Sequence, residues 1–375
     1  MKVSIVGAGP AGLFFSILLK QSDATHDITI YEKNAVNTTY GFGVGFSKGA
    51  LNFLQKANVH LHKKILSAAQ HLNHLTITHQ GESIPIFGTD FYGIERIHLL
   101  NLLRQQALEN DVRILNNYHI EDLNDFEDSD LIIGADGVNS IIRNFYKHYF
   151  NPHIIQCKNR LIWYATSKVT NGIEIIFKET EAGLFIGHTY RYTPNQNTFV
   201  VECTPNAWHH AGLNTMSEKE SQHYCENVFS EFLDGHPLIS NHSFWFNPKI
   251  IKINNWVNGH ITLLGDALKT MHPSIGSGTR AAMQDAISLA DACSENPTDI
   301  EAALKQFEQR HKPKANKLQK AALQSIHWYE SVHERLHLSS YEFAYDYMMR
   351  TGKIDHNQMC KMDPDFVRAY ESIRQ

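Results

Sequence analysis

The sequence lacks the features that define several protein classes. Its five cysteines are an odd, scattered set without CxxC spacing, which favours free thiols in a reducing compartment over a disulfide framework. Its 23 histidines match no metal-binding spacing, so no metal is expected. No apolar run reaches the ~18 residues needed to cross a bilayer. The formal net charge is only −5, without a basic stripe, which argues against nucleic acid as a partner. We therefore expect a cytoplasmic protein with no membrane partner.

Apolar patterning indicates two interleaved parts in this chain of 375 residues. Residues 2–6 form a predicted buried strand that leads through a glycine-rich turn into a helix, and short apolar runs at 130–136 and 261–266 predict further buried strands. Between residues 151 and 255, β-rich runs follow one another at hairpin spacing. This pattern predicts a nucleotide-binding domain assembled from distant segments, with a mostly antiparallel sheet inserted into it.

The turn after the first strand carries a dinucleotide-binding motif. Gly7, Gly9 and Gly12 have GxGxxG spacing between the predicted strand and helix. The first glycine of such a motif permits the tight turn, the second lets the backbone approach a pyrophosphate, and the third lets the helix pack on the sheet. Glu32 lies twenty residues after Gly12, at the end of the second predicted strand, where a carboxylate can accept hydrogen bonds from ribose hydroxyls. The motif does not separate NAD from FAD.

Two other buried strands end in a glycine and an aspartate. The segment LIIGADGVNSIIR places Asp136 after a strand, and a capped turn explains this residue as well as a function does. The segment LLGDALKTMHPSIGSGTRAAMQDAISLADA places Asp266 at a strand end, ahead of a glycine-rich entrance to a long amphipathic helix.

In order along the chain, these three motifs resemble those of the class A flavin-dependent aromatic hydroxylases, the para-hydroxybenzoate hydroxylase type. GIERIHLLNLL adds Arg96 where that family has an arginine at the start of a helix. Within the group, YGFGVGFS, IWYATS, HTYRY and HPSIGSGT are most similar to segments of the tryptophan hydroxylase of violacein biosynthesis, and then to the salicylyl-CoA and anthraniloyl-CoA hydroxylases. Many members have a histidine after GDAA, where this chain has Leu268 and Lys269. Whether His272 replaces that histidine stays open.

The resemblance implies an α/β fold. It consists of a Rossmann-like FAD-binding domain of the glutathione-reductase type, an inserted and mostly antiparallel β-sheet substrate domain, and a helical C-terminus. The expected FAD-binding domain covers residues 1–150 and 256–330 and includes a small β-hairpin at 75–87. The expected substrate domain covers residues 151–255, and a helical segment covers residues 331–375.

The resemblance also implies how FAD is held. Asp266 is expected to accept hydrogen bonds from the ribityl hydroxyls, and Pro273 to fix the backbone near the ring. Backbone N–H groups at the start of the following helix are expected to face the pyrimidine end of the flavin, where the helix dipole favours the reduced flavin anion by ~1–2 kcal/mol. The residues predicted to bind the cofactor are Gly7, Gly9, Pro10, Ala11, Gly12, Glu32, Lys33, Arg96, Asp136, Gly265, Asp266, Pro273, Gly276, Gly278 and Thr279.

The inserted sheet is expected to cover the reactive face of the flavin. Its candidate pocket residues are Trp163, His188, Tyr190 and Tyr192, and core packing is the alternative for each of them. Strand alternation places the last three on one face, so we expect that all three line the pocket or that none does. The glycines of YGFGVGFS predict a mobile loop near the flavin. No catalytic residue is assigned.

The function that the resemblance implies is hydroxylation of an electron-rich aromatic substrate by FAD, NADPH or NADH, and O₂, through a flavin C4a-hydroperoxide. A single GxGxxG agrees with a nicotinamide nucleotide that docks transiently. The small aromatic substrate, either tryptophan- or indole-like or anthranilate- or salicylate-like, is left open, and no cluster of lysines and arginines in the sequence points to a CoA thioester. An FAD-dependent reductase and a non-catalytic flavin-binding regulator are the alternatives, and a monomer or a homodimer is expected.

Overall fold

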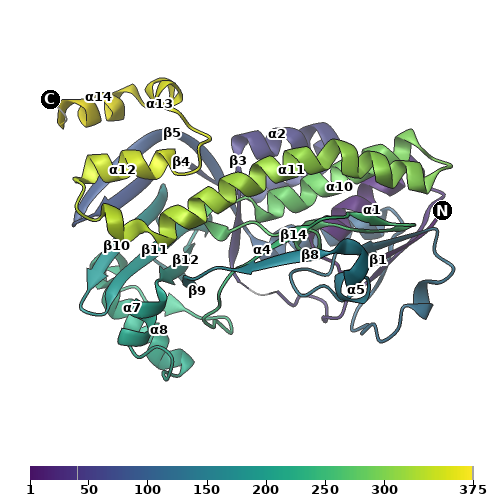
Figure 1. The fold of residues 1–375 in the computed structure, drawn as a ribbon, viewed down its shortest axis with the longest axis horizontal. Coiled ribbons are helices and arrows are strands. Elements are labelled where there is room, and N and C mark those ends of the chain that lie inside the picture. Colours follow the sequence, from purple (N-terminus) through teal and green to yellow (C-terminus); the bar gives the residue numbers. More distant parts are fainter. Residues whose placement is uncertain (40, 374–375) are drawn as a thin grey trace.

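The computed structural model describes residues 1–39 and 41–373. The molecule is elongated, with a β-sheet toward each end and one long helix running beside both (Figure 1). Tyr40, the first residue of the YGFGVGFS segment, lies outside the described residues.

The first sheet is made of the predicted buried strands and two short additions. Its members are β1 (Lys2–Val6), β2 (Asp27–Tyr31), β6 (Arg113–Leu115), β7 (Leu131–Gly134), β15 (Val257–Asn258) and β16 (Ile261–Leu263). The strand order is β15-β16-β7-β1-β2-β6, and all neighbours are parallel except β15 and β16. The central strands are apolar along nearly their whole length because helices bury the sheet, as is usual for parallel strands.

Helices surround this sheet and fix the positions of its strand ends. The helices of this part are α1 (Pro10–Ser22), α2 (Lys48–Ala57), α3 (Val59–Ala68), α4 (Arg96–Glu109), α5 (Ile141–Phe145), α6 (Lys147–Phe150) and α10 (Gly278–Glu295). Pro10 occupies the first helical position of α1, where its missing N–H costs no intrahelical hydrogen bond. α1 packs between α4 and α10, which brings the GxGxxG turn next to the glycine-rich entrance of α10.

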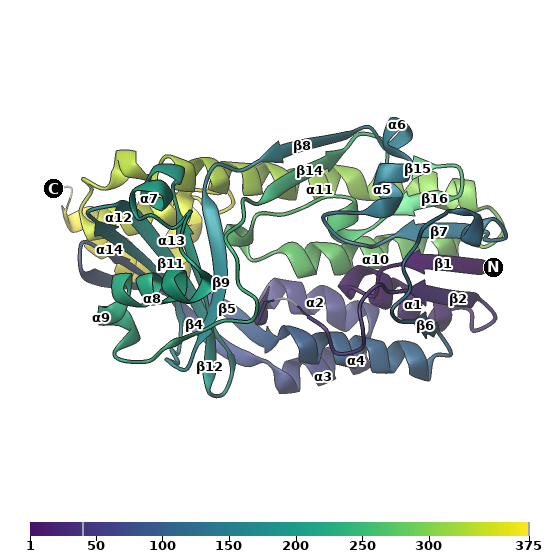
Figure 2. The same ribbon diagram turned by 90° about the horizontal axis from the view of Figure 1, so that it is seen from below.

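The second sheet has eight strands. These are β3 (Gly43–Ser47), β4 (Gln70–His79), β5 (Glu82–Glu95), β9 (Arg160–Thr166), β10 (Ile173–Thr180), β11 (Gly183–Thr193), β12 (Gln196–Cys203) and β13 (Leu238–Ile239). Their order is β13-β9-β12-β11-β10-β4-β5-β3. Figure 2 shows this sheet at the end of the molecule opposite the first sheet. All neighbours are antiparallel except β10 and β4.

Helices also cover both faces of the second sheet. One face packs against α11 (Ile300–Glu330), α12 (Ser340–Met349), α13 (His356–Met362) and α14 (Pro364–Ile373). The other face packs against α7 (Pro205–His210), α8 (Glu218–Val228) and α9 (Ser230–Leu233). The alternation along β11 therefore buries both sets of side chains in separate apolar clusters.

Two expectations need correction. The hairpin expected at 75–87 exists, but β4 pairs in parallel with β10, so the hairpin belongs to the second sheet and not to the FAD-binding part. The glycine segment expected to be a mobile loop is, from Gly43 to Ser47, the strand β3 paired with β5. A side chain at Gly45 would overlap the ring of Phe91, so this glycine allows close aromatic packing.

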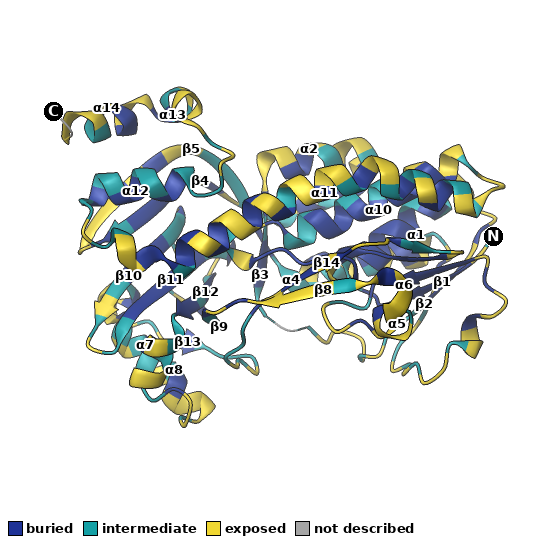
Figure 3. Ribbon diagram, viewed as in Figure 1, coloured by how far each residue is buried: buried dark blue, intermediate teal, exposed yellow. Residues whose placement is uncertain are grey.

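A two-stranded ribbon joins the two sheets. β8 (Pro152–Gln156) carries the chain toward the second sheet and β14 (Lys249–Ile253) brings it back, paired antiparallel. β8 is largely exposed (Figure 3). Within residues 1–39 and 41–373, no helix combines the length and the apolar character needed to span a bilayer.

Candidate active site

The glycine-rich turn has the geometry that its sequence predicts. Gly7 has a φ of +105°, and a Cβ atom there would overlap the carbonyl of Ala135. A Cβ at Gly12 would overlap the carbonyl of Gly7, so the third glycine is required for α1 to approach β1. Gly9 differs, since the nearest atom to its hypothetical Cβ is 3.9 Å away. The turn therefore leaves open space at the N-terminus of α1, where backbone N–H groups favour an anion.

A cavity of about 120 Å³ extends from this turn along the end of β2. Glu32 is fixed there, because its carboxylate accepts hydrogen bonds from the backbone N–H groups of Ala8 and Asn34, both at 2.8 Å. Arg104 from α4 also lines the cavity, and burial lowers its pKa while the charge of Glu32 opposes that shift. No motif in the sequence points to Arg104. Lys33 is exposed and does not line the cavity.

Asp136 caps a helix instead of lining a cavity. Its Oδ2 accepts a hydrogen bond of 2.6 Å from the backbone N–H of Ile141 at the start of α5. Burial raises the pKa of Asp136, and its hydrogen bonds with Ser140 and the backbone oppose that rise. Arg143, on the same helix, donates a hydrogen bond of 2.9 Å to the carbonyl of Ala267. Through this hydrogen bond, the GADGVNS segment stabilises the position of the GDA segment.

Arg96 and Asp266 lie where the first cavity meets a second one. Arg96 lines both cavities and donates a hydrogen bond of 3.1 Å to the hydroxyl of Thr39. Burial lowers the pKa of Arg96, and the nearby Asp266 carboxylate opposes this change. Burial raises the pKa of Asp266, and Arg96 and Lys269 oppose that rise. Asp266 exposes its surface to the second cavity, and among the described residues its carboxylate has no hydrogen-bond partner.

The entrance of α10 forms one wall of this second cavity, whose volume is about 280 Å³. Pro273 begins a short 3₁₀ helix, and Gly276 follows it with a φ of +53° that glycine adopts without strain. Gly278, the first residue of α10, has no atom within 4 Å of a hypothetical Cβ. The helix N-terminus is therefore accessible from the cavity.

The second sheet forms the opposite wall. Trp163 on β9 and both His188 and Tyr190 on β11 line the cavity, so the face that carries them is the one turned toward α10. Tyr190 donates a hydrogen bond of 2.9 Å to the carbonyl of Gly43, and burial raises its pKa. Tyr192 does not line the cavity.

The expectation that His188, Tyr190 and Tyr192 either all line the cavity or all lie outside it is wrong. Tyr192 is 3% exposed, packs against Gly43 and donates a hydrogen bond of 2.7 Å to Gln196. Burial raises the pKa of Tyr192 to about 12. The pairing register of β11 shifts between Arg191 and Thr193, which ends the regular alternation just where Tyr192 stands.

A buried carboxylate, which no sequence motif indicates, lies beside His188. Glu202 on β12 is 1% exposed, and its Oε2 is 3.2 Å from the Nε2 of His188. The side-chain amide of Asn159 donates a hydrogen bond of 2.8 Å to its other oxygen. Burial pushes the pKa of Glu202 upward, but the hydrogen bond with His188 opposes this and the pKa is held below its usual value. The cavity therefore ends in an ionised carboxylate paired with a histidine.

His272 does not line the second cavity and is a neutral imidazole. It is 2% exposed, and burial lowers its pKa to about 4. The backbone N–H of Ser274 donates a hydrogen bond of 3.3 Å to its Nδ1, so the proton of the neutral ring is on Nε2. His272 orders the segment that leads into α10.

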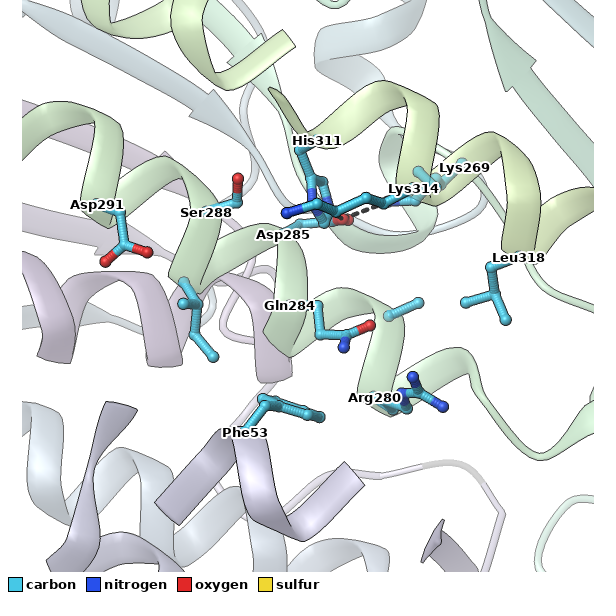
Figure 4. Close-up of a pocket in the computed structure, with 13 residues that line it drawn as sticks. Phe53, Lys269, Arg280, Gln284, Asp285, Ser288, Asp291, His311, Lys314 and Leu318 are labelled. Carbon is cyan, nitrogen blue, oxygen red and sulfur yellow. Dashed lines mark hydrogen bonds and ion pairs between the residues drawn. The ribbon is translucent and has the colours of Figure 1, made fainter. Parts of the chain in front are cut away.

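Lys269, the departure from the family pattern, belongs to a buried network (Figure 4). Asp285 on α10 is fully buried, forms an ion pair with Lys269 and lies 2.7 Å from the Nε2 of His311 on α11. Its second oxygen accepts a hydrogen bond of 3.0 Å from the backbone N–H of Gly265. Lys269 thus helps to position the Gly265-Asp266 turn through Asp285.

Together, the two cavities fit FAD. The open space at Gly9 suits a pyrophosphate, Glu32 suits the ribose, and the unpaired Asp266 carboxylate suits hydroxyl donors of a ribityl chain. Arg96 connects the two cavities, so one extended molecule can pass from one to the other. The aromatic side chains of the second cavity and the N-terminus of α10 would suit a planar ring system between them.

Comparisons with known proteins agree with this geometry. The family model "FAD binding domain" matches residues 125–322. The salicyloyl-CoA 5-hydroxylase of a Streptomyces species is 32% identical over 390 residues, which covers 99% of this chain and 75% of the relative. The protodeoxyviolaceinate monooxygenase of Chromobacterium violaceum is 33% identical, over 93% of this chain and 94% of the relative.

Solved structures show the same fold at lower identity. The tetrameric 2-methyl-3-hydroxypyridine-5-carboxylic acid oxygenase superposes with a TM-score of 0.71 at 19% identity, over 98% of this chain and 97% of that chain. A probable FAD-dependent monooxygenase from Pseudomonas aeruginosa superposes with a TM-score of 0.67 at 14% identity, over 93% of this chain and 100% of that chain.

The fold and the paired cavities define an FAD-binding oxidoreductase with an aromatic-lined chamber. At this level of similarity the chain belongs to the class A FAD-dependent aromatic hydroxylases, and it is an FAD-dependent aromatic monooxygenase. The family expectation from the sequence is confirmed.

Proposed function

We propose that the protein hydroxylates an aromatic ring that carries a hydroxyl or amino group, with NADPH or NADH as the reductant. The overall reaction consumes one O₂, one NAD(P)H and one proton, and it forms the hydroxylated ring, NAD(P)⁺ and water. Bound FAD supplies the hydride acceptance and the oxygen activation. The residues of the chain bind the substrate, orient it and exclude water from it.

The observation that carries the proposal is the His188 and Glu202 pair at the end of the second cavity. A histidine held by an ionised carboxylate is suited to accept a proton from a ring hydroxyl or to accept a hydrogen bond from a ring amine. Removing or polarising that proton makes the ring more electron-rich, which favours attack by an electrophilic oxygen.

The remaining cavity residues fit the same orientation. Trp163 and Tyr190 provide flat apolar surface for an aromatic ring, and α10 presents its N-terminus on the opposite side. Arg96 and Asp266 are proposed to hold the central part of FAD, and Gly9 and Glu32 its adenosine half. Relatives named for salicyloyl-CoA and for 3-hydroxy-4-methyl-anthranilyl-(aryl-carrier protein) act, by their names, on rings with hydroxyl or amino groups.

A substrate screen tests the proposal. Holoenzyme is mixed with NADH or NADPH and with matched pairs of phenols, anilines and indoles, each paired with its O- or N-methylated analogue. We expect the free hydroxyl or amino compounds to stimulate NAD(P)H oxidation and to give products heavier by one oxygen atom. Label from ¹⁸O₂ should appear in those products.

Two results would contradict the proposal. Products that carry ¹⁸O only from labelled water would exclude oxygen transfer from O₂. An equal ratio of hydroxylated product to oxidised NAD(P)H for the free and the methylated compounds would exclude a proton-accepting role for His188 and Glu202.

A further inference from the structure

The wall of the second cavity that leads into α10 is a short segment, residues 272–276, with few hydrogen bonds to the rest of the fold. Pro273, Ser274 and Gly276 from this segment line the cavity. Its backbone N–H groups donate hydrogen bonds only within the segment. Among the described residues, the two hydrogen bonds that join the segment to distant parts of the chain both involve Ser274. The position of this wall therefore depends on the partners of Ser274.

Both of these hydrogen bonds lead to Arg350, the residue that follows α12. Arg350 donates a hydrogen bond of 3.1 Å to the carbonyl of Ser274 and one of 3.2 Å to the hydroxyl of Ser325 on α11. The hydroxyl of Ser325, which is fully buried, lies 2.8 Å from the hydroxyl of Ser274. Arg350 therefore fixes Ser274 twice, directly at its backbone and through Ser325 at its side chain.

The hydroxyl groups of this cluster form a chain with one direction. The Nδ1 atom of neutral His272 can only accept a hydrogen bond, and the hydroxyl of Ser274 lies 2.9 Å from it. The single hydroxyl proton of Ser274 therefore points to His272, so Ser274 accepts a hydrogen bond from Ser325. Ser325 accepts in turn from Arg350, because a guanidinium can only donate. Arg350 thus sets the orientation of both hydroxyl groups.

Aromatic rings of α11 and α12 hold Arg350 itself in place. The Cζ atom of its guanidinium lies 3.7 Å from the ring centroid of Tyr347 and 5.8 Å from that of Tyr329, within the range of cation–π attraction. Arg350 also donates a hydrogen bond of 2.8 Å to the carbonyl of Tyr347. The ring of Tyr329 packs against His188, with the ring centroids 5.3 Å apart. The cluster therefore borders the wall at residues 272–276 and the histidine of the opposite wall.

We propose that Arg350 is a positioning residue of the active site, which holds the wall at residues 272–276 in place through Ser274 and Ser325. This inference rests on the proposed function, in which the second cavity holds the reacting rings. Arg350 does not line the cavity, so it acts through Ser274 and not by contact with the substrate. A wall held in one position keeps water out of the cavity and so limits the loss of activated oxygen as hydrogen peroxide.

A second arginine of the same region offers a matched control. Arg335 donates a hydrogen bond of 3.1 Å to the hydroxyl of Ser331 and one of 2.9 Å to the carboxylate of Asp346 on α12. Among the described residues, it forms no hydrogen bond with residues 272–276. Loss of either arginine removes contacts between α12 and the end of α11, but only loss of Arg350 should move the cavity wall.

Spectra of FAD-loaded enzyme test the inference without turnover. The visible absorption spectrum of bound flavin responds to the polar groups around its ring, so Arg350→Gln and Ser325→Ala should shift it, whereas Arg335→Gln and Ser331→Ala should not. Arg350→Lys keeps the charge but loses the planar fork of donors, so it should show the same shift as Arg350→Gln. Melting temperatures should fall for both glutamine variants. If Arg350→Gln does not retain FAD, Ser325→Ala decides the test.

Turnover gives a second measurement on the same samples. The ratio of hydrogen peroxide to hydroxylated product should rise severalfold in Arg350→Gln and Ser325→Ala and should stay at the wild-type value in Arg335→Gln and Ser331→Ala. Unchanged spectra and ratios in both test variants would overturn the inference, as would equal changes in the two control variants. If no aromatic compound is hydroxylated, the proposed function fails, whereas the flavin spectra still decide the role of Arg350.

Discussion

The Nε2 atom of His188 lies 3.2 Å from the carboxylate of Glu202 across two neighbouring strands. His188 pairs directly with Val200, so Glu202 is its diagonal neighbour on the same face of the sheet. The strand ladder therefore fixes the distance between the two groups, and ligand binding need not assemble them.

Replacing the carboxylate of this pair should uncouple the enzyme. In Glu202→Gln the imidazole loses its charged partner, so it should accept a substrate proton less readily and orient the ring less well. We expect the ratio of hydrogen peroxide to product to rise severalfold while FAD content stays the same. Oxygen-electrode and peroxide assays across pH 6–9 measure this. Glu231→Gln, at an exposed ion pair with Lys178, is the control, and an equal rise there would refute the assignment.

Loss of Asp266 should weaken FAD binding more than loss of Asp136. The Asp266 carboxylate faces the second cavity without a protein partner, whereas Asp136 caps α5. Asp266→Ala should cost about 1–3 kcal/mol of FAD binding, the usual effect of losing a hydrogen bond to a buried group. Asp136→Ala should lower the melting temperature instead. Equal FAD affinity in wild type and Asp266→Ala, by fluorescence titration, would show that Asp266 is not a ligand.

The three glycines of the turn should respond differently to alanine. Gly12→Ala forces a clash with the carbonyl of Gly7 and should destabilise the fold. Gly9→Ala meets no protein atom closer than 3.9 Å, so the protein should fold while FAD binds more weakly. Circular dichroism and flavin absorbance distinguish these outcomes. Normal FAD content in Gly9→Ala would mean that the pyrophosphate does not approach this turn.

His272 should make stability depend on mildly acidic pH. Its pKa is about 4 in the folded protein and ordinarily 6.5, so between these values the unfolded chain binds a proton that the folded protein does not. The free energy of unfolding should fall as the pH drops through this window, by up to about 3 kcal/mol. Urea unfolding at pH 7 and pH 4.5 tests this against His272→Gln. The loss attributable to His272 should be missing in the variant, and an equal loss in both proteins would contradict it.

The sequence predicts best where the chemistry is local. The spacing of Gly7, Gly9 and Gly12 specifies a strand, a turn and a helix within a dozen residues, and the structure has them. The parallel pairing of β4 with β10 joins segments about a hundred residues apart, and nothing in either strand specifies its partner. The sequence therefore does not reveal that the hairpin expected in the FAD-binding domain joins the second sheet.

The site residues that were missed are also non-local. In the sequence Glu202 is an ordinary strand residue, because only the pairing of β11 with β12 brings His188 next to it. Tyr192 leaves the cavity because of a register shift that strand alternation cannot anticipate.

The helix α11 has a consequence for how the protein melts. It contributes Phe307 to the apolar cluster of the first sheet and Trp328 to that of the second. Its 31 residues form a rod of about 46 Å at 1.5 Å per residue. If the apolar cluster of either sheet loses its contacts with α11, the cluster of the other sheet is disturbed as well. Heating should therefore unfold both sheets in one cooperative transition. Flavin loading should then also protect segments outside the two cavities from proteolysis.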